Sequence, residues 1–178
     1  IPGKRFEFVP LHLDDLNRAV EVGNIDFVLT QPEHYVVLRT RHGLAAVATL
    51  MPLAGGHPVS RFGGVIVTRA GRQDIRELAD LRGRTVAAAH QNSLGSYRVQ
   101  QWALLQAGIH VPDDLKGVSF TGQSQDEVIR QVLNNQVDVG FVRTGLIESM
   151  VDEGKLDAGA LKVINPQDDP GFPLRRST

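Results

Sequence analysis

The chain has 178 residues, of which 42% are hydrophobic and 22% are charged. That apolar content is enough for a folded core, which excludes a disordered chain, and the length fits one or two small lobes. Lysine and arginine number 19 against 20 acidic residues, which excludes a large electrostatic footprint for nucleic acid. The absence of cysteine excludes disulfide scaffolds, cysteine-ligated zinc, iron–sulfur clusters and thiol catalysis.

The sequence contains no stretch that predicts a membrane span. The longest uncharged stretch, residues 43–60, is broken by prolines, glycines and a histidine, so the roughly 20 continuous apolar residues of a transmembrane helix are missing. Residues 1–6 lack the basic segment and apolar run of a secretory signal. Because neither end carries an obvious start or stop signal, we expect a domain trimmed from a longer chain.

Short apolar runs alternate with amphipathic stretches in the first half of the chain. Helical spacing from Leu13 to Val20, ending at Gly23, predicts one helix, and Pro32 predicts the first turn of another that runs through Leu38. Alternating or continuous apolar runs predict strands at residues 4–9, 25–29, 44–50 and 63–69.

The second half repeats this rhythm. Asp74 with Glu77 and Ser124 with Glu127 have the spacing of capping boxes, so each pair predicts a helix start. Trp102 is expected in the core because it has helical spacing with neighbouring apolar residues. Further strands are predicted at 85–89, 118–120, 137–142 and 161–164, with helices at 96–107 and 146–153. The alternation predicts an α/β fold with mixed, mostly parallel sheets.

Two segments rich in glycine and proline, 51–61 and 166–173, interrupt the rhythm. They predict a first lobe over residues 1–68, an inserted second lobe over 69–166, and a segment 167–178 that returns to the first lobe. Two crossings between lobes would form a hinge, and the cleft between the lobes is then the expected ligand site.

Polar loops between a predicted strand and a predicted helix occur at residues 90–96 and 121–126. The free N–H groups and the positive dipole end of a helix N-terminus bind anions. In an open α/β sheet both loops would lie at the carboxyl ends of the strands, where ligands bind. The alternative interpretation is that each loop is an ordinary capped turn.

Three further positions could complete such a site. Arg143 follows a predicted strand and could give an anion a forked, permanently charged donor, or it could form a surface salt bridge. Thr30–Gln31 ends a first-lobe strand and would place a hydroxyl and an amide on the opposite wall. Phe62–Gly63 would bring an aromatic ring and bare backbone to the ligand.

The sequence gives little support for catalysis. The six histidines show no zinc-ligand spacing, and no nucleophile elbow, phosphate-binding Walker loop or dinucleotide fingerprint occurs. We therefore expect no catalytic residue, no metal and no cofactor, and we predict that this domain is not an enzyme.

Several segments together resemble the type II periplasmic binding fold, within it the phosphonate-binding-protein-like family. They are FGGVIVTRAG, IRELADLRGRTVAAA, NSLGSY, FTGQSQDEVIRQV, VDVGFVRTG and LKVINP, in that order. GSYRVQQWALLQAGI, TGQSQDEVI and VGFVRTGLIESM resemble the extracytoplasmic sensor region of tetrathionate-sensing-type histidine kinases. The resemblance implies a two-lobed clamshell that closes on a small solute, and a strand and helix that precede Ile1.

Residue by residue, the resemblance and the loops above predict one set of ligand-binding residues. They are Thr30, Gln31, Phe62, Gly63, Ser93, Leu94, Gly95, Ser96, Tyr97, Ser124, Gln125, Asp126, Arg143 and Thr144. Phosphonate binders carry Ser-His-Asp where this chain has Ser-Gln-Asp at 124–126, and an acidic residue near Arg143. These departures favour a ligand without an ammonium group.

The resemblance implies a periplasmic ligand-sensing domain of a two-component histidine kinase in the inner membrane. Its expected partner is a small anionic solute, and no binding of nucleic acid is expected. Contact with the membrane is expected only through segments outside this chain, and a homodimer is possible. The alternative is the solute-binding subunit of an ABC transporter for phosphonate- or phosphate-like oxyanions. An enzyme of the same architecture and the effector domain of a transcription regulator are more distant alternatives.

Overall fold

The computed structural model describes residues 2–51, 53–54, 57–59, 61–122 and 124–165. The chain divides into two compact units, 1–47 and 48–178. This division lies earlier than the lobe boundary expected after residue 68, and the lobe assignment remains a prediction. The expected return segment, 167–178, lies outside the described residues.

The first unit contains the two helices that the sequence predicts. Helix α1 spans Leu13–Glu21 and α2 spans Pro32–His42, with proline at its first position. Gly43 ends α2 in the left-handed conformation, with φ of 71°, which glycine adopts without strain.

The strands predicted at 4–9, 25–29 and 44–50 are wrong, because none of these described residues forms a ladder. The rings of Phe6 and Phe27 lie 6.2 Å apart, so two of these segments are neighbours without pairing. An apolar alternation predicts which side chains could face a core, but a strand also needs a hydrogen-bonded partner.

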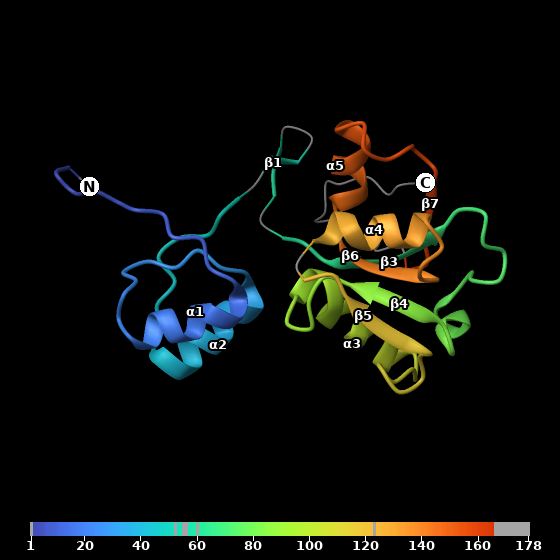
Figure 1. Ribbon diagram of the computed structural model, residues 1–178, viewed down its shortest axis with the longest axis horizontal. Coiled ribbons are helices and arrows are strands. Elements are labelled where there is room, and N and C mark those ends of the chain that lie inside the picture. Colours follow the sequence, from blue (N-terminus) through green and yellow to red (C-terminus); the bar gives the residue numbers. More distant parts are fainter. Residues whose placement is uncertain (1, 52, 55–56, 60, 123, 166–178) are drawn as a thin grey trace. The chain divides into compact units, whose positions relative to one another are not determined.

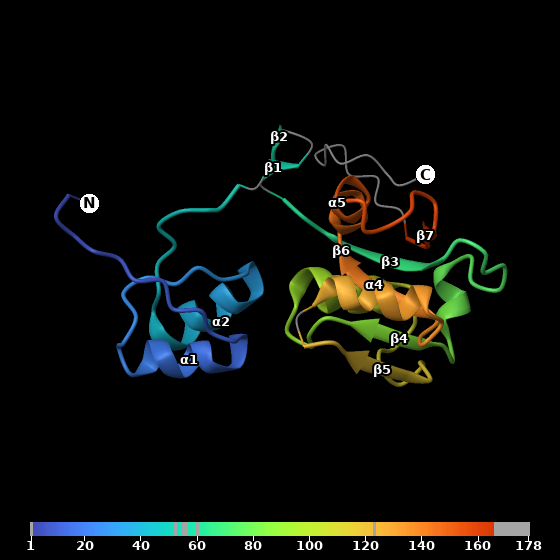
Figure 2. The same ribbon diagram turned by 45° about the horizontal axis from the view of Figure 1, so that its top comes forward.

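The second unit is built on a five-stranded sheet with the order β5-β4-β6-β3-β7 (Figures 1 and 2). Strand β4 pairs in parallel with β5 and β6, whereas β3 pairs antiparallel with β6 and β7. The sheet is mixed, as predicted, but parallel pairs do not predominate. The strands are β3 Gly64–Arg69, β4 Thr85–Ala88, β5 Gly117–Phe120, β6 Val139–Arg143 and β7 Leu161–Val163; a separate pair comprises β1 Leu53–Ala54 and β2 His57–Pro58.

Helices cover both faces of this sheet, with α3 on one face and α4 on the other (Figure 1). Ile66 packs in one core cluster with Leu104 of α3, while the next residue, Val67, packs in the other with Val128 of α4. Because successive side chains of a strand point to opposite faces of the sheet, neighbouring residues of β3 pack into two separate cores. The helical segments are η1 Leu78–Leu81, η2 Leu94–Arg98, α3 Val99–Gln106, α4 Gln125–Leu133 and α5 Leu146–Asp152.

Two sequence predictions in this unit need correction. The capping box of η1 uses Glu77 and Asp80 rather than Asp74, because the Asp74 carboxylate is paired with Arg72. Trp102 is not in the core, since 64% of its surface is exposed. Gln100 and Leu104 are the buried positions of α3, which places Trp102 on the outward face.

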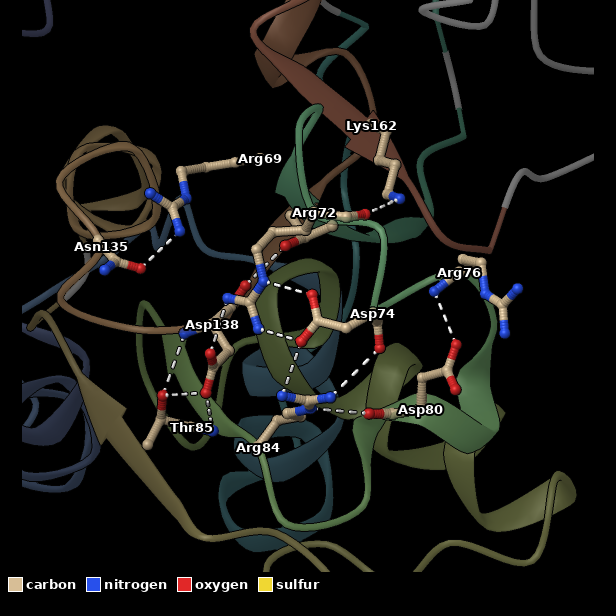
Figure 3. Close-up of polar contacts among 11 residues, drawn as sticks. Arg69, Arg72, Asp74, Arg76, Asp80, Arg84, Thr85, Asn135, Asp138 and Lys162 are labelled. Atoms are coloured by element: carbon tan, nitrogen blue, oxygen red, sulfur yellow. Dashed lines mark hydrogen bonds and ion pairs between the residues drawn. The ribbon is translucent and has the colours of Figure 1, made fainter.

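Charged side chains form a paired group at the amino ends of β4 and β6, here called the amino-end cluster (Figure 3). Arg72 contacts Asp74 at 2.7 Å and Asp138 at 2.8 Å, and Arg84 contacts Asp74 at 2.9 Å. Asp138 also accepts hydrogen bonds from the N–H and the hydroxyl of Thr85, at 3.0 and 2.8 Å. The cluster joins β4, β6 and the turn after β3 at the end opposite the candidate site.

Among the described residues, none of the helices has the length and apolar character needed to cross a membrane.

Candidate functional site

The carboxyl ends of β4, β5 and β6 and the start of the antiparallel strand β3 share one edge of the sheet. The loops that follow these strands lead into the helical segments η2 and α4. All the predicted ligand-binding residues of the second unit are at this edge, which is where open α/β sheets bind ligands. We call this group the carboxyl-end site.

Arg143 is the residue around which the two loops meet. Its backbone N–H donates to the Oε1 atom of Gln125, the first residue of α4, at 2.8 Å. On its other side lies Gly95, where an added Cβ would stand 3.0 Å from the Arg143 Cβ and 2.9 Å from a ring carbon of Phe62. The sequence expectation that both strand-to-helix loops lie close together is met.

The segment that enters β3 is fastened to the end of β6. The N–H of Gly63 donates to the Oγ1 atom of Thr144 at 2.9 Å, and the N–H of Thr144 donates to the Gly63 carbonyl at 3.0 Å. The Thr144 hydroxyl therefore braces two backbone segments beside Arg143. Phe62, next to this brace, is 40% exposed, and its contact with a ligand remains a prediction.

The hydroxyl groups of the 93–97 loop are engaged within the protein. The Ser96 side chain is fully buried; its hydroxyl donates to the Phe141 carbonyl at 2.7 Å and accepts from the Ala89 N–H at 2.8 Å. The Ser93 hydroxyl accepts from the Ser96 N–H at 3.3 Å and caps the helix start. Ser96 holds the loop against β4 and β6, and its hydroxyl hydrogen is already used in the bond to Phe141. The Ser93 hydroxyl is shown only as an acceptor within the loop.

Backbone amides are the donors that remain at both loops. In the described part of the chain, no protein acceptor faces the N–H groups of Leu94 and Gly95, or those of Gln125 and Asp126. Each pair belongs to the first turn of its helix, where N–H groups have no intrahelical partner. Ser124 caps α4 by accepting from the Glu127 N–H at 3.2 Å, as its sequence spacing predicts.

The charges at this edge of the sheet favour an anionic ligand. The Arg143 side chain is exposed and, within the described residues, forms no ion pair, so the salt-bridge interpretation is not supported. Burial raises the pKa of the Tyr97 phenol, which keeps that group neutral. The Tyr97 ring meets Phe120 edge to face, with centroids 5.2 Å apart, and thereby links the two loops.

Thr30 and Gln31 belong to the first compact unit, so their place in the site remains a prediction. Thr30 has a buried hydroxyl oxygen with no hydrogen-bond partner in the described residues. Gln31 is the residue before α2, and its carbonyl accepts from the Tyr35 N–H at 3.0 Å. No group of three or more metal-ligating side chains occurs among the described residues.

Sequence reasoning missed Gln100, a fully buried amide that contacts the carboxyl-end site from behind. It donates to the carbonyls of Gly95 and Val142 at 2.8 and 2.9 Å. The available signal was a glutamine at the buried position of an otherwise apolar helical face, a residue type that is rarely buried.

The mixed sheet and the helices on both its faces define a domain of the type II periplasmic-binding-like fold, with a polar edge around Arg143. The chain belongs to the family described as ABC transporter, phosphonate, periplasmic substrate-binding protein, which matches residues 3–170. The fold class and the family resemblance expected from the sequence are confirmed.

The chain is similar to a sensor histidine kinase and to solved structures of the same fold. The chain is 32% identical over 158 residues to the tetrathionate sensor histidine kinase TtrS of Salmonella typhimurium, covering 88% of this chain and 26% of that protein. The structure of XAC2383 from Xanthomonas citri bound to ATP has a TM-score of 0.66 at 21% identity, over 86% of this chain and 57% of that one. PhnD1 from Prochlorococcus marinus in complex with methylphosphonate has a TM-score of 0.64 at 17% identity, over 87% and 57%.

The chain thus spans about a quarter of the kinase it matches and somewhat more than half of each of these two solved chains.

Proposed function

We propose that this chain is the extracytoplasmic sensing domain of a sensor histidine kinase and that it binds a small oxyanion at the carboxyl-end site. The similarity to TtrS supports the kinase setting, because the chain matches about a quarter of that protein, as a sensor domain within a larger receptor would. Kinase activity and contact with the membrane then belong to segments outside this chain.

The observation that carries the ligand class is Arg143 between two helix N-termini, with a guanidinium that forms no ion pair among the described residues. Its charge neutralises an anion, while the amides of Gly95 and Gln125 and their neighbours in both first turns supply hydrogen-bond donors. A guanidinium and helix-terminal N–H groups are the groups that proteins commonly use to hold oxyanions. A phosphonate, the ligand class in the family description, is such an oxyanion.

Signalling would follow from closure of two lobes on the ligand. Thr30 and Gln31 are proposed to contact the bound anion from the first lobe, so that the closed form gains contacts which the open form lacks. Only this difference in affinity can shift the population toward the closed form. A homodimer of the receptor would be one way to carry the shift through the membrane.

A solute-binding subunit of an ABC transporter is the second candidate, favoured by the family description. The two candidates share the site and differ in what surrounds the domain. The full-length reading frame separates them: a kinase module on the same polypeptide supports the sensor, and a separate permease gene beside a short reading frame supports the transporter.

Titration calorimetry tests the ligand and the site together. We expect binding of at least one anion among tetrathionate, sulfate, phosphate and methylphosphonate, and about 100-fold weaker binding by Arg143→Ala, because a hydrogen bond to a charged group contributes on the order of 1.5–3 kcal/mol. Arg76→Ala, which removes another exposed arginine near the amino-end cluster, is the matched control and should bind like the parent. Equal affinity of Arg143→Ala and the parent would refute the assigned role.

A further inference from the structure

Gln100 lies beneath the carboxyl-end site with no solvent exposure. It is the second residue of α3 and follows Gly95 by five positions, in a helix that begins with the π-helical turn η2. A side-chain amide is seldom buried unless it forms hydrogen bonds. We therefore expect the buried Gln100 amide to form hydrogen bonds within the protein.

The Gln100 amide nitrogen faces three carbonyl oxygens from three elements. It donates to Gly95 at 2.8 Å, to Val142 at 2.9 Å and to Val65 at 3.2 Å. Because carbonyls only accept, this end of the side chain must be the NH₂ group, and its two hydrogens are shared among three acceptors. One buried side chain thus ties the start of η2 to β6 and β3.

Two glycines give the amide and its surroundings their room. A Cβ at Gly64 would lie 2.3 Å from the Gln100 amide nitrogen, so the amide occupies the space that a side chain at position 64 would need. Gly95 in turn lies against Phe62 and Arg143. The carbonyls that Gln100 holds are those of Gly95 itself, of the residue before Arg143, and of the residue after Gly64.

We infer that Gln100 is a positioning residue of the anion site: it fixes the first-turn amides at Gly95 relative to the guanidinium-bearing end of β6. Gln100 itself need not touch the ligand. The inference rests on the proposed function for its effect on binding, but its effect on the two backbone segments holds without any ligand.

The test compares Gln100→Met, which keeps an unbranched side chain and removes the donor, with Thr68→Val. Thr68 is also fully buried on β3, and its hydroxyl donates to the Asp138 carbonyl at 2.8 Å, at the amino-end side of the sheet. Both variants lose a buried donor. Amide resonances of the ¹⁵N-labelled, ligand-free chain are recorded first, and the affinity for tetrathionate, sulfate, phosphate and methylphosphonate second.

We expect Gln100→Met to move the amide resonances of Gly95 and Arg143 and to weaken anion binding by about ten-fold, the lower end of what loss of an orienting partner does at metal sites. Thr68→Val should leave both properties as in the parent. Gly64→Ala, which displaces the amide while keeping it, should reproduce the effect and serves if Gln100→Met does not fold.

Unmoved Gly95 and Arg143 resonances in Gln100→Met or Gly64→Ala would overturn the inference, as would equal loss of affinity in Thr68→Val. If the parent binds none of the four anions, the proposed function fails, while the resonances still decide whether Gln100 positions the two segments.

Discussion

At the amino ends of β4 and β6, charged side chains pair with one another, whereas at the carboxyl ends of the same strands the Arg143 guanidinium forms no ion pair among the described residues. Asp138 accepts from Thr85 and Arg72, and Arg72 and Arg84 share Asp74. At the other end, the hydroxyls of Ser96 and Thr144 and the carbonyls of Gly95 and Val142 form hydrogen bonds. Among the described residues, the Arg143 guanidinium and the first-turn amides are the donors without a protein acceptor.

This difference separates polar groups that hold the fold from those that are available to a ligand. A paired cluster stabilises the protein only while all its members are present, because removal of one leaves the others without partners. An exposed cation without a partner contributes little to stability and retains its donors for binding. Substitutions at the two ends should therefore affect different measurements.

The largest expected effect is the loss of stability in Asp138→Ala. The change leaves the Thr85 N–H without its acceptor and leaves the Arg72 guanidinium with Asp74 alone. We expect the free energy of unfolding to fall by about 2–3 kcal/mol, in the range for an unsatisfied buried polar group. Urea unfolding measures this. Anion affinity measured by calorimetry on the folded fraction should not change.

The matched control is Asp113→Ala, which removes an exposed carboxylate in the turn after Pro112 and should change the unfolding free energy by less than about 0.5 kcal/mol. An Asp138→Ala variant as stable as this control would show that the amino-end cluster does not support the fold.

A smaller effect, on affinity rather than on stability, is expected for Gly95→Ala. The added methyl group would meet the Phe62 ring at 2.9 Å and the Arg143 Cβ at 3.0 Å, so one of them must shift. We expect anion binding to weaken about ten-fold, equivalent to about 1.4 kcal/mol. Gly71→Ala, at a glycine whose added Cβ meets nothing within 4 Å, is the control and should bind normally.

If Gly95→Ala binds each anion as the parent does, the first turn of η2 is not part of the site.

The second unit was more predictable from sequence than the first because its elements carry local signals. The Ser124 cap and the apolar runs of β3 and β6 specify their own structure over a few residues. The segments 4–9 and 25–29 also have the apolar pattern of strands. A β-ladder, however, needs a partner strand, and the local sequence does not show which segment that would be.

The sequence predicted which residues gather at this edge of the sheet but not the hydrogen bonds that their side chains form. Strand ends followed by polar loops predicted that these residues share one edge around Arg143, and they do. That a ligand binds at this edge remains a prediction. The same reasoning placed Ser96 among the ligand-binding residues, whereas its hydroxyl bonds to the backbone of Ala89 and Phe141. Gln100 was also not singled out from the sequence. Each role depends on a carbonyl of β6 that lies more than 40 residues away along the chain, which sequence spacing does not show.

The smallest expected effect is the pH dependence of stability, which should also separate the two ends. The pKa of Asp74 is lowered, chiefly by its hydrogen bonds with Arg72. Burial alone would raise the pKa of Asp138, but the Thr85 and Arg72 hydrogen bonds outweigh it, so that pKa is lowered as well. A carboxylate with a lowered folded-state pKa stabilises the protein above its unfolded pKa of about 4, and this contribution is lost as the pH falls further.

The free energy of unfolding should therefore be level near neutral pH and fall from about pH 4 downward. The fall should be shallower in Asp138→Asn, because the asparagine amide has no carboxylate that takes up a proton in acid. Arg143→Ala should follow the parent curve, because a guanidinium keeps its charge across this range. Urea unfolding at a series of pH values tests both statements. An acid limb of unchanged steepness in Asp138→Asn would mean that other carboxylates, not this cluster, control acid unfolding.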